Sequence, residues 1–345
     1  MKKNNIINKL FKYSIFLILV GVTFYVVFKN NNIGDFLTNL KNANFIFILL
    51  GVLCMFTFLA CEALNVRRIL TTLGDKLSFM KSMRYSFVGF FFSSITPSST
   101  GGQPAQIYFM NKDGIPISHS TLALLVELSG YQLATGILAL IGFALNFDII
   151  IHHLGNIKFL VFLGVAINLI ILALLIVMIF SKKIALKLAN LVEKILKFFH
   201  YSKADKLKTS FVAQIDEYHK CSIYLKENKS VLAKVLITNI VQLTAYHAVP
   251  YCIFLSFGLT GFSAMTIILM EAVLYIAVAS LPFPGAVGIS EGTFMIMFKM
   301  FFPEYLLGSA MIISRGISFY LFVLISAVGV IVSFLTSKSK KKKAN

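Results

Sequence analysis

The sequence is poor in charge, and above all in acidic residues. Of its 345 residues, 32 are Lys or Arg and 14 are Asp or Glu, so only 13% are charged. Ordinary soluble domains carry about 25%. Hydrophobic residues make up 58% of the chain, and the mean hydropathy is +0.83. A soluble protein of this size could not bury so much apolar surface. The composition therefore predicts an integral membrane protein.

Other absences exclude further classes. The four cysteines have no CxxC or metal-ligand spacing, so we expect small apolar residues and no metal site. No nucleophile elbow, HExxH, Asp-rich transfer motif or Walker-type loop is present in the sequence. We therefore predict no catalytic residue and no cofactor. The net charge of +18 comes from Lys residues between and beyond the apolar runs. Lysines in these positions set the orientation of a membrane protein and contact anionic lipid, so we expect no direct nucleic-acid binding.

Nine apolar stretches decide the topology. A spanning helix needs about 20 residues, and the third, seventh and eighth stretches are short or are broken by Gly and Pro. The first lacks the small-x-small cleavage site of a signal peptide, so we expect an uncleaved helix. In order, the stretches are Tyr13–Phe28, Phe45–Ala60, Phe79–Thr96, Thr121–Phe147, Phe159–Phe180, Val231–Phe257, Met265–Leu281, Ala286–Phe302 and Gly308–Leu335.

Lys and Arg mark the cytoplasmic side, and their positions restrict the third stretch. The chain is predicted to be cytoplasmic at Arg84 and again at Lys182, with two safe spans between these residues. The stretch 79–96 then cannot be a simple crossing. We expect it to enter from the cytoplasm, turn at Thr96–Pro104 and return near Lys112.

A second interruption lies at 282–285. The two pieces beside it form either two full spans or a second hairpin that enters from outside. With the hairpin, two broken elements would approach the midplane from opposite faces, as in transporters built from inverted elements.

The predicted fold is all-α: one polytopic domain over 1–345, with about six full spans, two Pro/Gly-broken pairs and both termini cytoplasmic. Apolar residues at helical spacing in 181–230 indicate either a surface helix on anionic lipid or a plain cytoplasmic connector. The parts are N-terminal helices 10–180 with broken element 79–118, the Lys-rich connector 181–230, C-terminal helices 231–335 with broken element 263–302, and the basic tail 336–345.

The first candidate site is 96–108, TPSSTGGQPAQIY. Non-helical backbone at membrane depth is tolerated only where it is buried in protein or lines a wet cavity. Two glycines, several hydroxyls and a following helix N-terminus can present N–H groups to a phosphate. A plain interhelical turn is the alternative. The candidate residues are Gly101, Gly102, Gln103 and Gln106.

The second candidate site is 282–292, PFPGAVGISEG, in which a Pro/Gly break precedes a carboxylate. An isolated charge in hydrocarbon is costly, so this carboxylate should face water or an interior partner. The candidate residues are Pro284, Gly285, Gly288 and Glu291.

Further ionisable residues also lie inside apolar runs: Glu127, Glu271, Arg315 and His247. The first three, with Glu291, can line a shared polar cavity in which Arg315 faces a lipid phosphate through its bidentate fork. A structural pair such as Glu291 with Arg315 is the alternative. For His247, a packing role is favoured over a proton relay.

These segments resemble the lysylphosphatidylglycerol synthetase transmembrane family, the flippase-like membrane region of the multiple peptide resistance factor (MprF), which also occurs as standalone proteins. The resemblance runs from Phe11 to Thr336 and rests on TP…GGQP…Q at 96–106, VELSGY at 126–131 and PFPGAVGISEG at 282–292. It implies a multi-pass protein of the bacterial plasma membrane with re-entrant segments. It also implies movement of phospholipids, notably lysyl-phosphatidylglycerol, between leaflets, and so a link to lipid metabolism and antimicrobial peptide resistance.

The sequence departs from the family pattern in its charges. Gln103 and Gln106 stand where relatives often carry Glu and Arg, Tyr131 where many have Asp, and Ala286 where Gly is common, whereas Glu127 and Glu291 match. The family's soluble aminoacyltransferase domain would follow Leu335, where only a short tail remains. We therefore do not expect this chain to synthesise the lipid alone.

The leading expectation is a translocase whose partners are anionic or aminoacylated phospholipids. One alternative is the membrane component of a phosphatidylglycerol lysyltransferase, which would use lysyl-tRNA through a separate soluble aminoacyltransferase. Another is a scaffold for envelope enzymes such as a glycosyltransferase. The sequence leaves open whether the chain forms a homo-oligomer.

Overall fold

The computed structural model describes residues 33–153, 157–181, 219–279, 281 and 284–342, and within these ranges it contains helices and no strand. The predicted span 13–28 and most of the connector 181–230 lie outside the described residues. The all-α polytopic prediction is confirmed. Within the described residues, five helical segments are long and apolar enough to cross a membrane: Phe45–Thr72, Ile117–Leu145, Phe159–Ile179, Lys229–Ser256 and Glu304–Ile331.

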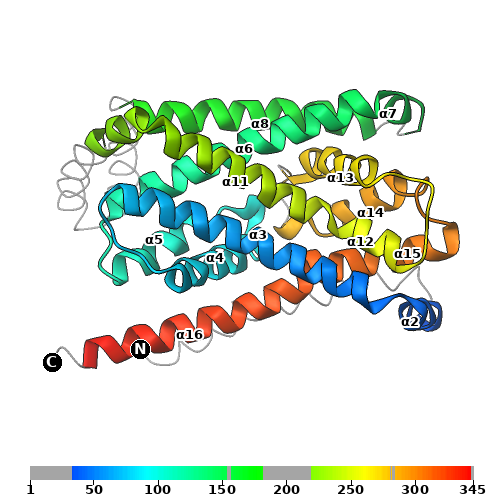
Figure 1. Cartoon of the computed structure of the whole chain (residues 1–345), viewed down its shortest axis with the longest axis horizontal. Helices are drawn as coiled ribbons and strands as arrows, with labels where there is room; N and C mark the ends of the chain where they lie inside the picture. The colour runs from blue at the N-terminus through cyan, green and yellow to red at the C-terminus, as the bar shows by residue number, and fades with distance from the viewer. Residues whose placement is uncertain (1–32, 154–156, 182–218, 280, 282–283, 343–345) are drawn as a thin grey trace, which may run out of the picture.

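The helices form one elongated bundle (Figure 1). Several long helices run along its length, and shorter ones fill its middle. In chain order the elements are α2 (Ile33–Asn42), α3 (Phe45–Thr72), α4 (Phe79–Ser94), the 3₁₀ turn η1 (Pro97–Ser99), α5 (Gly102–Lys112), α6 (Ile117–Leu145), α7 (Phe147–His153), α8 (Ile157–Phe180), α11 (Lys229–His247), α12 (Val249–Ser256), α13 (Ala264–Ala279), the 3₁₀ turn η2 (Pro284–Ala286), α14 (Ile289–Met297), α15 (Glu304–Arg315), the π-helical segment η3 (Gly316–Leu321) and α16 (Phe322–Lys342).

Side chains next to the helix ends explain where the first helices begin. Asn44 precedes α3, and its Oδ1 accepts from the Ile46 N–H at 3.0 Å. Its own N–H donates to the Ser256 carbonyl at 2.7 Å, which ties the start of α3 to the end of α12. Ser78 is the equivalent capping residue for α4, with 3.4 Å from its Oγ to the Lys81 nitrogen. Such caps satisfy N–H groups that a helix leaves unpaired.

The first hairpin consists of α4, η1 and α5. With 16 and 11 residues, neither helix is long enough for a full crossing. Arg84 at the start of α4 forms an ion pair with Asp113 just after α5, and the Tyr85 hydroxyl donates to the same carboxylate at 2.7 Å. These bonds close the hairpin at its base. The turn predicted at Thr96–Pro104 is present but shorter, because α4 ends at Ser94 and α5 already begins at Gly102.

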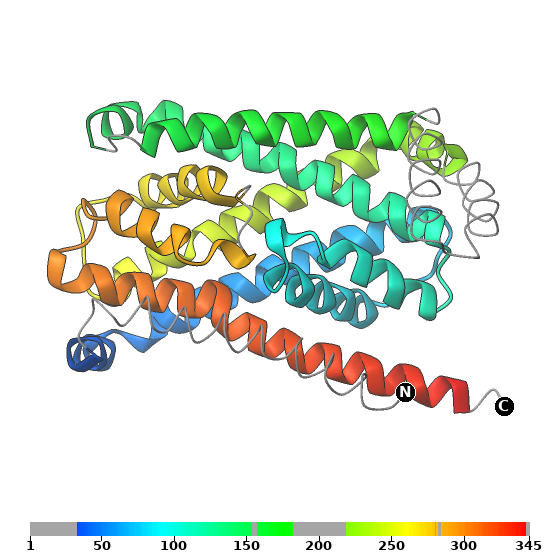
Figure 2. The same cartoon turned by 180° about the vertical axis from the view of Figure 1, so that it is seen from behind.

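The second hairpin consists of α13, η2 and α14. These helices have 16 and 9 residues, so the structure favours the hairpin over two full spans. The turns η1 and η2 contact each other, and the two hairpins point at each other from opposite ends of the bundle (Figures 1 and 2). The sequence predicted this opposed arrangement as one of two alternatives. The tips of the two hairpins therefore meet near the middle of the long helices.

A buried polar network holds three long helices beside the first hairpin. Asn65 of α3 donates to Asn239 Oδ1 of α11 at 2.7 Å, and Asn239 donates to the Glu127 carbonyl of α6 at 3.3 Å. Arg68, one turn further along α3, donates to Asn65 Oδ1 at 2.9 Å. Both asparagines are fully buried. Because buried polar groups are costly unless paired, this network fixes α3, α6 and α11 in register.

Candidate functional site

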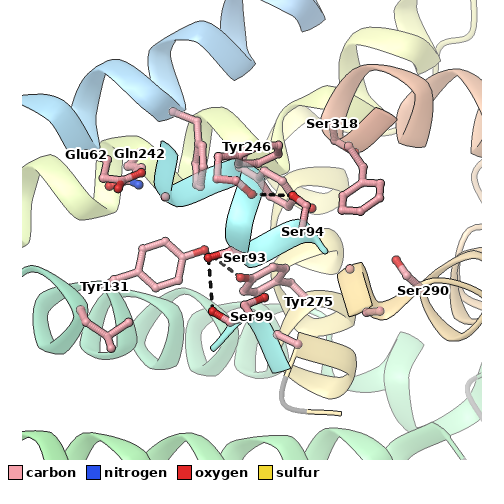
Figure 3. Close-up of a pocket in the computed structure, with 18 of the residues that line it drawn as sticks. Glu62, Ser93, Ser94, Ser99, Tyr131, Gln242, Tyr246, Tyr275, Ser290 and Ser318 are labelled. Carbon is pink, nitrogen blue, oxygen red and sulfur yellow. Dashed lines mark hydrogen bonds between the residues drawn. The ribbon is translucent and has the colours of Figure 1, made fainter. Parts of the chain in front are cut away.

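A cavity of about 230 Å³ lies where the two hairpin tips meet. Residues from both hairpins and from the long helices line it (Figure 3). Phe58, Phe90, Leu128 and Phe319 are among its apolar walls. The polar residues that line it are Glu62, Ser93, Ser94, Ser99, Gln103, Gln106, Glu127, Tyr131, Gln242, Tyr246, Tyr275, Ser290, Arg315 and Ser318.

One end of the cavity is acidic. Glu62 of α3 and Glu127 of α6 both line it and lie within electrostatic range of each other. Gln106 of α5 donates from Nε2 to Glu62 Oε1 at 2.6 Å and to the Tyr85 carbonyl at 3.1 Å. In the part of the chain that the structure describes, no Lys, Arg or His forms an ion pair with either carboxylate. Gln242 of α11 also lines the cavity.

The tip of the first hairpin packs tightly against the end of α4. The Gly101 N–H donates to Thr96 Oγ1 at 2.9 Å. A Cβ on Gly102 would collide with Ser93 Oγ and would lie 2.9 Å from the Gly89 carbonyl oxygen, so only glycine permits this approach. Gln103 in the first turn of α5 lines the cavity. The two glycines therefore shape the turn, and Ser99 and Gln103 are side chains that this tip presents to the cavity.

Arg315 is the cation of the cavity wall. Its Nε donates to Glu291 Oε1 at 2.9 Å, and its Nη2 donates to the Gly285 carbonyl at 2.9 Å. The guanidinium also lies 4.7 Å from the centre of the Phe319 ring. The structural pair that the sequence allowed is thus formed, while Arg315 still lines the cavity. A guanidinium has five N–H donors, so these two bonds leave others for a ligand.

The backbone of the second tip is shaped around Glu291. The Gly288 N–H donates to Glu291 Oε2 at 2.7 Å, so the carboxylate caps its own helix. Gly288 and Gly285 have φ angles of 85° and 58°, a region that favours glycine. A Cβ on Gly285 would also collide with the Phe319 ring. Pro284 opens the turn η2. Glu291 itself is 3% exposed and is not among the lining residues.

A π-helical segment, Gly316–Leu321, follows Arg315 directly. Within it, Ser318 and Phe319 line the cavity, while the Tyr320 hydroxyl donates to Glu291 Oε1 at 3.1 Å. Three consecutive residues of this segment thus contact either the cavity or Glu291. Segments of this kind are rare and occur frequently at functional sites.

Tyrosines connect the acidic end to Arg315, because Tyr131 lies within electrostatic range of Glu127 and Tyr246 within electrostatic range of Arg315. The hydroxyls of Tyr131 of α6 and Tyr275 of α13 are 2.8 Å apart and share a hydrogen bond. The ring of Tyr246 of α11 lies 5.5 Å from that of Tyr275 and 5.4 Å from that of Phe58. Tyr131 occupies the position at which the resemblance implies Asp. The middle of the cavity is therefore uncharged and aromatic.

Besides Glu291, two further ionisable residues singled out in the sequence lie outside the cavity lining. Glu271 is one turn before Tyr275 on α13, within electrostatic range of Arg315. Its Oε2 is buried without a hydrogen-bond partner among the described residues. The His247 ring is fully buried and lies edge-on to the rings of Tyr246 and Tyr275, each 5.4 Å away. That position fits the packing role expected for His247.

The structure thus brings five of the predicted residues into one cavity: Gln103, Gln106, Glu127, Gly285 and Arg315. Glu62 was missed because the apolar stretch was ended at Ala60, whereas α3 continues to Thr72. Buried apolar residues at helical spacing after Glu62, such as Val66 and Ile69, were the available signal. Tyr131 stood out through its place in VELSGY, but no sequence signal distinguishes Tyr246 and Tyr275 from the other aromatic residues of the spans.

Known proteins resemble the chain over almost its whole length. A family model described as "Lysylphosphatidylglycerol synthase TM region" matches residues 11–326. Over 332 residues the chain is 25% identical to a UPF0104 membrane protein of Archaeoglobus fulgidus, covering 94% of this chain and 98% of that protein. Over 322 residues it is 26% identical to a UPF0104 membrane protein of Pyrococcus horikoshii, covering 90% and 95%. These matches include both hairpins and both ends of the cavity.

Proposed function

The chain belongs to the lysylphosphatidylglycerol synthase transmembrane-region family, and from that premise we propose that it is a flippase-like translocase of phospholipids in the cell membrane. The observation that carries the proposal is the cavity between the two hairpin tips. It combines charged, amide and hydroxyl groups inside a bundle whose long helices are apolar. Polar groups buried among membrane helices usually mark a path for a polar substrate.

The two ends of the cavity suit the two charges of a modified head group. Arg315 would face the lipid phosphate with the N–H groups that Glu291 and Gly285 leave free. The acidic end would face the amine of an aminoacylated lipid such as lysyl-phosphatidylglycerol. The acyl chains would remain in the bilayer, so only the head group needs a polar path.

Leaflet-resolved lipid movement in liposomes tests this proposal. We expect the purified full-length protein to accelerate the movement of lysyl-phosphatidylglycerol, with plain phosphatidylglycerol as the comparison lipid. Glu291→Gln and Arg315→Gln should abolish the movement while the protein still inserts, because each breaks the ion pair at the second tip. Wild-type rates in both variants would contradict the site assignment. No movement of any lipid by the wild type would contradict the function.

A second candidate function is favoured by the description of the matching family, which names a synthase region. In this case the chain would be the membrane component of a phosphatidylglycerol lysyltransferase and would need a separate soluble aminoacyltransferase partner. Lysyl transfer from lysyl-tRNA, measured with and without a candidate partner, distinguishes the two. Transfer that requires this chain, in liposomes that show no lipid movement, would favour the synthase component.

A further inference from the structure

When Glu62 and Glu127 are ionised, the charges around the cavity do not balance. Glu291 and Arg315 neutralise each other across 2.9 Å. Glu62 and Glu127 face the same cavity, and neither has an ion-pair partner among the described residues. Two neighbouring carboxylates in a poorly solvated site repel each other, and each also loses hydration. A single positive charge placed between them would offset both costs.

Gln242 gives an independent indication of a ligand at this end. Its side chain is 1% exposed and lines the same cavity. Its Oε1 is buried without a hydrogen-bond partner in the described part of the protein. Leaving such an acceptor unpaired costs about 1–3 kcal/mol. Glu62, Glu127 and Gln242 thus bring acceptor oxygens from α3, α6 and α11 to the same cavity.

Neighbouring groups do not supply the missing positive charge. Gln106 uses Nε2 for both Glu62 and the Tyr85 carbonyl. Arg315 is committed to Glu291 and to the Gly285 carbonyl, and among the described residues it forms no ion pair with Glu62 or Glu127. The tyrosines Tyr131, Tyr246 and Tyr275 are the other titratable residues of the lining, and they are neutral near pH 7.

We propose that Glu62, Glu127 and Gln242 form a binding site for one monovalent cation. Carboxylate and amide oxygens are the ligands that hard cations prefer, and an ammonium group can donate its N–H groups to the same oxygens. The positive charge is supplied either by an alkali ion or by the amine of a lipid head group. The inference rests on the proposed function only for the second source, because binding of an alkali ion does not require lipid.

Thermal unfolding of the purified full-length protein in detergent tests the site. A thiol-reactive dye would report unfolding through the buried cysteines Cys61 and Cys252. NaCl, or ethanolamine hydrochloride as a small ammonium probe, would replace N-methylglucamine chloride at constant ionic strength and pH 8. We expect the unfolding midpoint to rise and saturate with at least one probe. Glu62→Gln or Glu127→Gln should weaken that response by about tenfold or more.

Glu304→Gln is the matched control, because Glu304 is an exposed acid at the start of α15. This variant should respond to the probes as the wild type does.

Saturation with sodium assigns the site to an alkali ion, and saturation with ethanolamine alone assigns it to a head-group amine. Responses to neither probe, or equal responses in the wild type and the Glu62 and Glu127 variants, would overturn the proposal. If these variants do not fold, ²³Na line broadening of the wild type, with ethanolamine as competitor, gives the same decision. Lipid movement in liposomes is measured separately, so the proposed translocase function and the proposed cation site can be rejected independently of each other.

Discussion

The first hairpin has an ion pair at its base, whereas the second hairpin has one at its tip. In the first hairpin, Arg84 and Asp113 join the base, and neither residue lines the cavity. In the second, Glu291 joins the tip to Arg315 of α15, which is part of the cavity wall. The same type of interaction therefore closes the fold in one hairpin and builds the candidate site in the other. An ion pair alone does not reveal function; its position relative to the cavity does.

Breaking the pair at the second tip should have the largest effect. Glu291→Gln leaves the Arg315 guanidinium buried without its counter-charge, which typically costs about 3–5 kcal/mol. Thermal unfolding in detergent measures this loss, and the liposome assay should show no translocation. The double variant Glu291→Leu/Arg315→Met is the control, since it removes both charges. It should recover much of the stability but no translocation, and recovered translocation would show that the charges are dispensable.

Overpacking the tip of the first hairpin should have the next largest effect on stability. Gly102→Ala forces α5 away from Ser93 and the Gly89 carbonyl, and overpacking of this kind costs about 1–3 kcal/mol. Gly292→Ala on α14 is a matched control, because a Cβ there meets no atom within 4 Å. We expect a lower unfolding midpoint for Gly102→Ala only. Equal midpoints in the two variants would contradict the close packing assigned to the first tip.

Breaking the pair at the base of the first hairpin should affect stability without affecting transport. Asp113→Asn removes the charge opposite Arg84, whose side chain is 19% exposed and so keeps some hydration. We therefore expect a smaller loss, about 1–2 kcal/mol. Translocation per folded molecule should stay close to that of the wild type. A transport defect as severe as that of Glu291→Gln would remove the distinction between base and tip.

The smallest effect is expected at the hydrogen bond between Tyr131 of α6 and Tyr275 of α13. Tyr131→Phe deletes the hydroxyl that bonds Tyr275 across 2.8 Å, which should cost about 0.5–1.5 kcal/mol. Thermal unfolding again measures the change. Tyr275→Phe should give a similar shift, and the double variant should give less than the sum of the two. Strictly additive shifts would show that the two hydroxyls do not interact.

Much of this architecture could be predicted from the sequence, because the membrane imposes simple rules. Cytoplasmic Arg84 and Lys182, with two full spans between them, required an interrupted element at 79–96, and α4, η1 and α5 form that element. At the second break, charge and length permitted two topologies. The short helices α13 and α14 and the contact between η1 and η2 favour the hairpin, and contacts between distant segments cannot be read from local sequence patterns.

The site could be predicted only in part for a related reason. Glu127 and Arg315 were identifiable because a charge inside an apolar run needs a partner or water. Glu62 was missed because it stands close to Arg67 and Arg68, which suggested that the helix had already left the membrane. Gln242 and Tyr275 carry no charge, so their role depends on the cavity that the fold creates around them.

The central claim is that a lipid head group passes through the cavity between the hairpin tips. The most direct test is leaflet-resolved movement of lysyl-phosphatidylglycerol in liposomes that contain Ser290→Phe, which fills the cavity without changing charge. Val328→Phe places the same ring on an exposed part of α16 and is the control. Our account predicts that the cavity variant inserts but does not move lipid, while the control matches the wild type. Equal movement in all three proteins would contradict a path through this cavity.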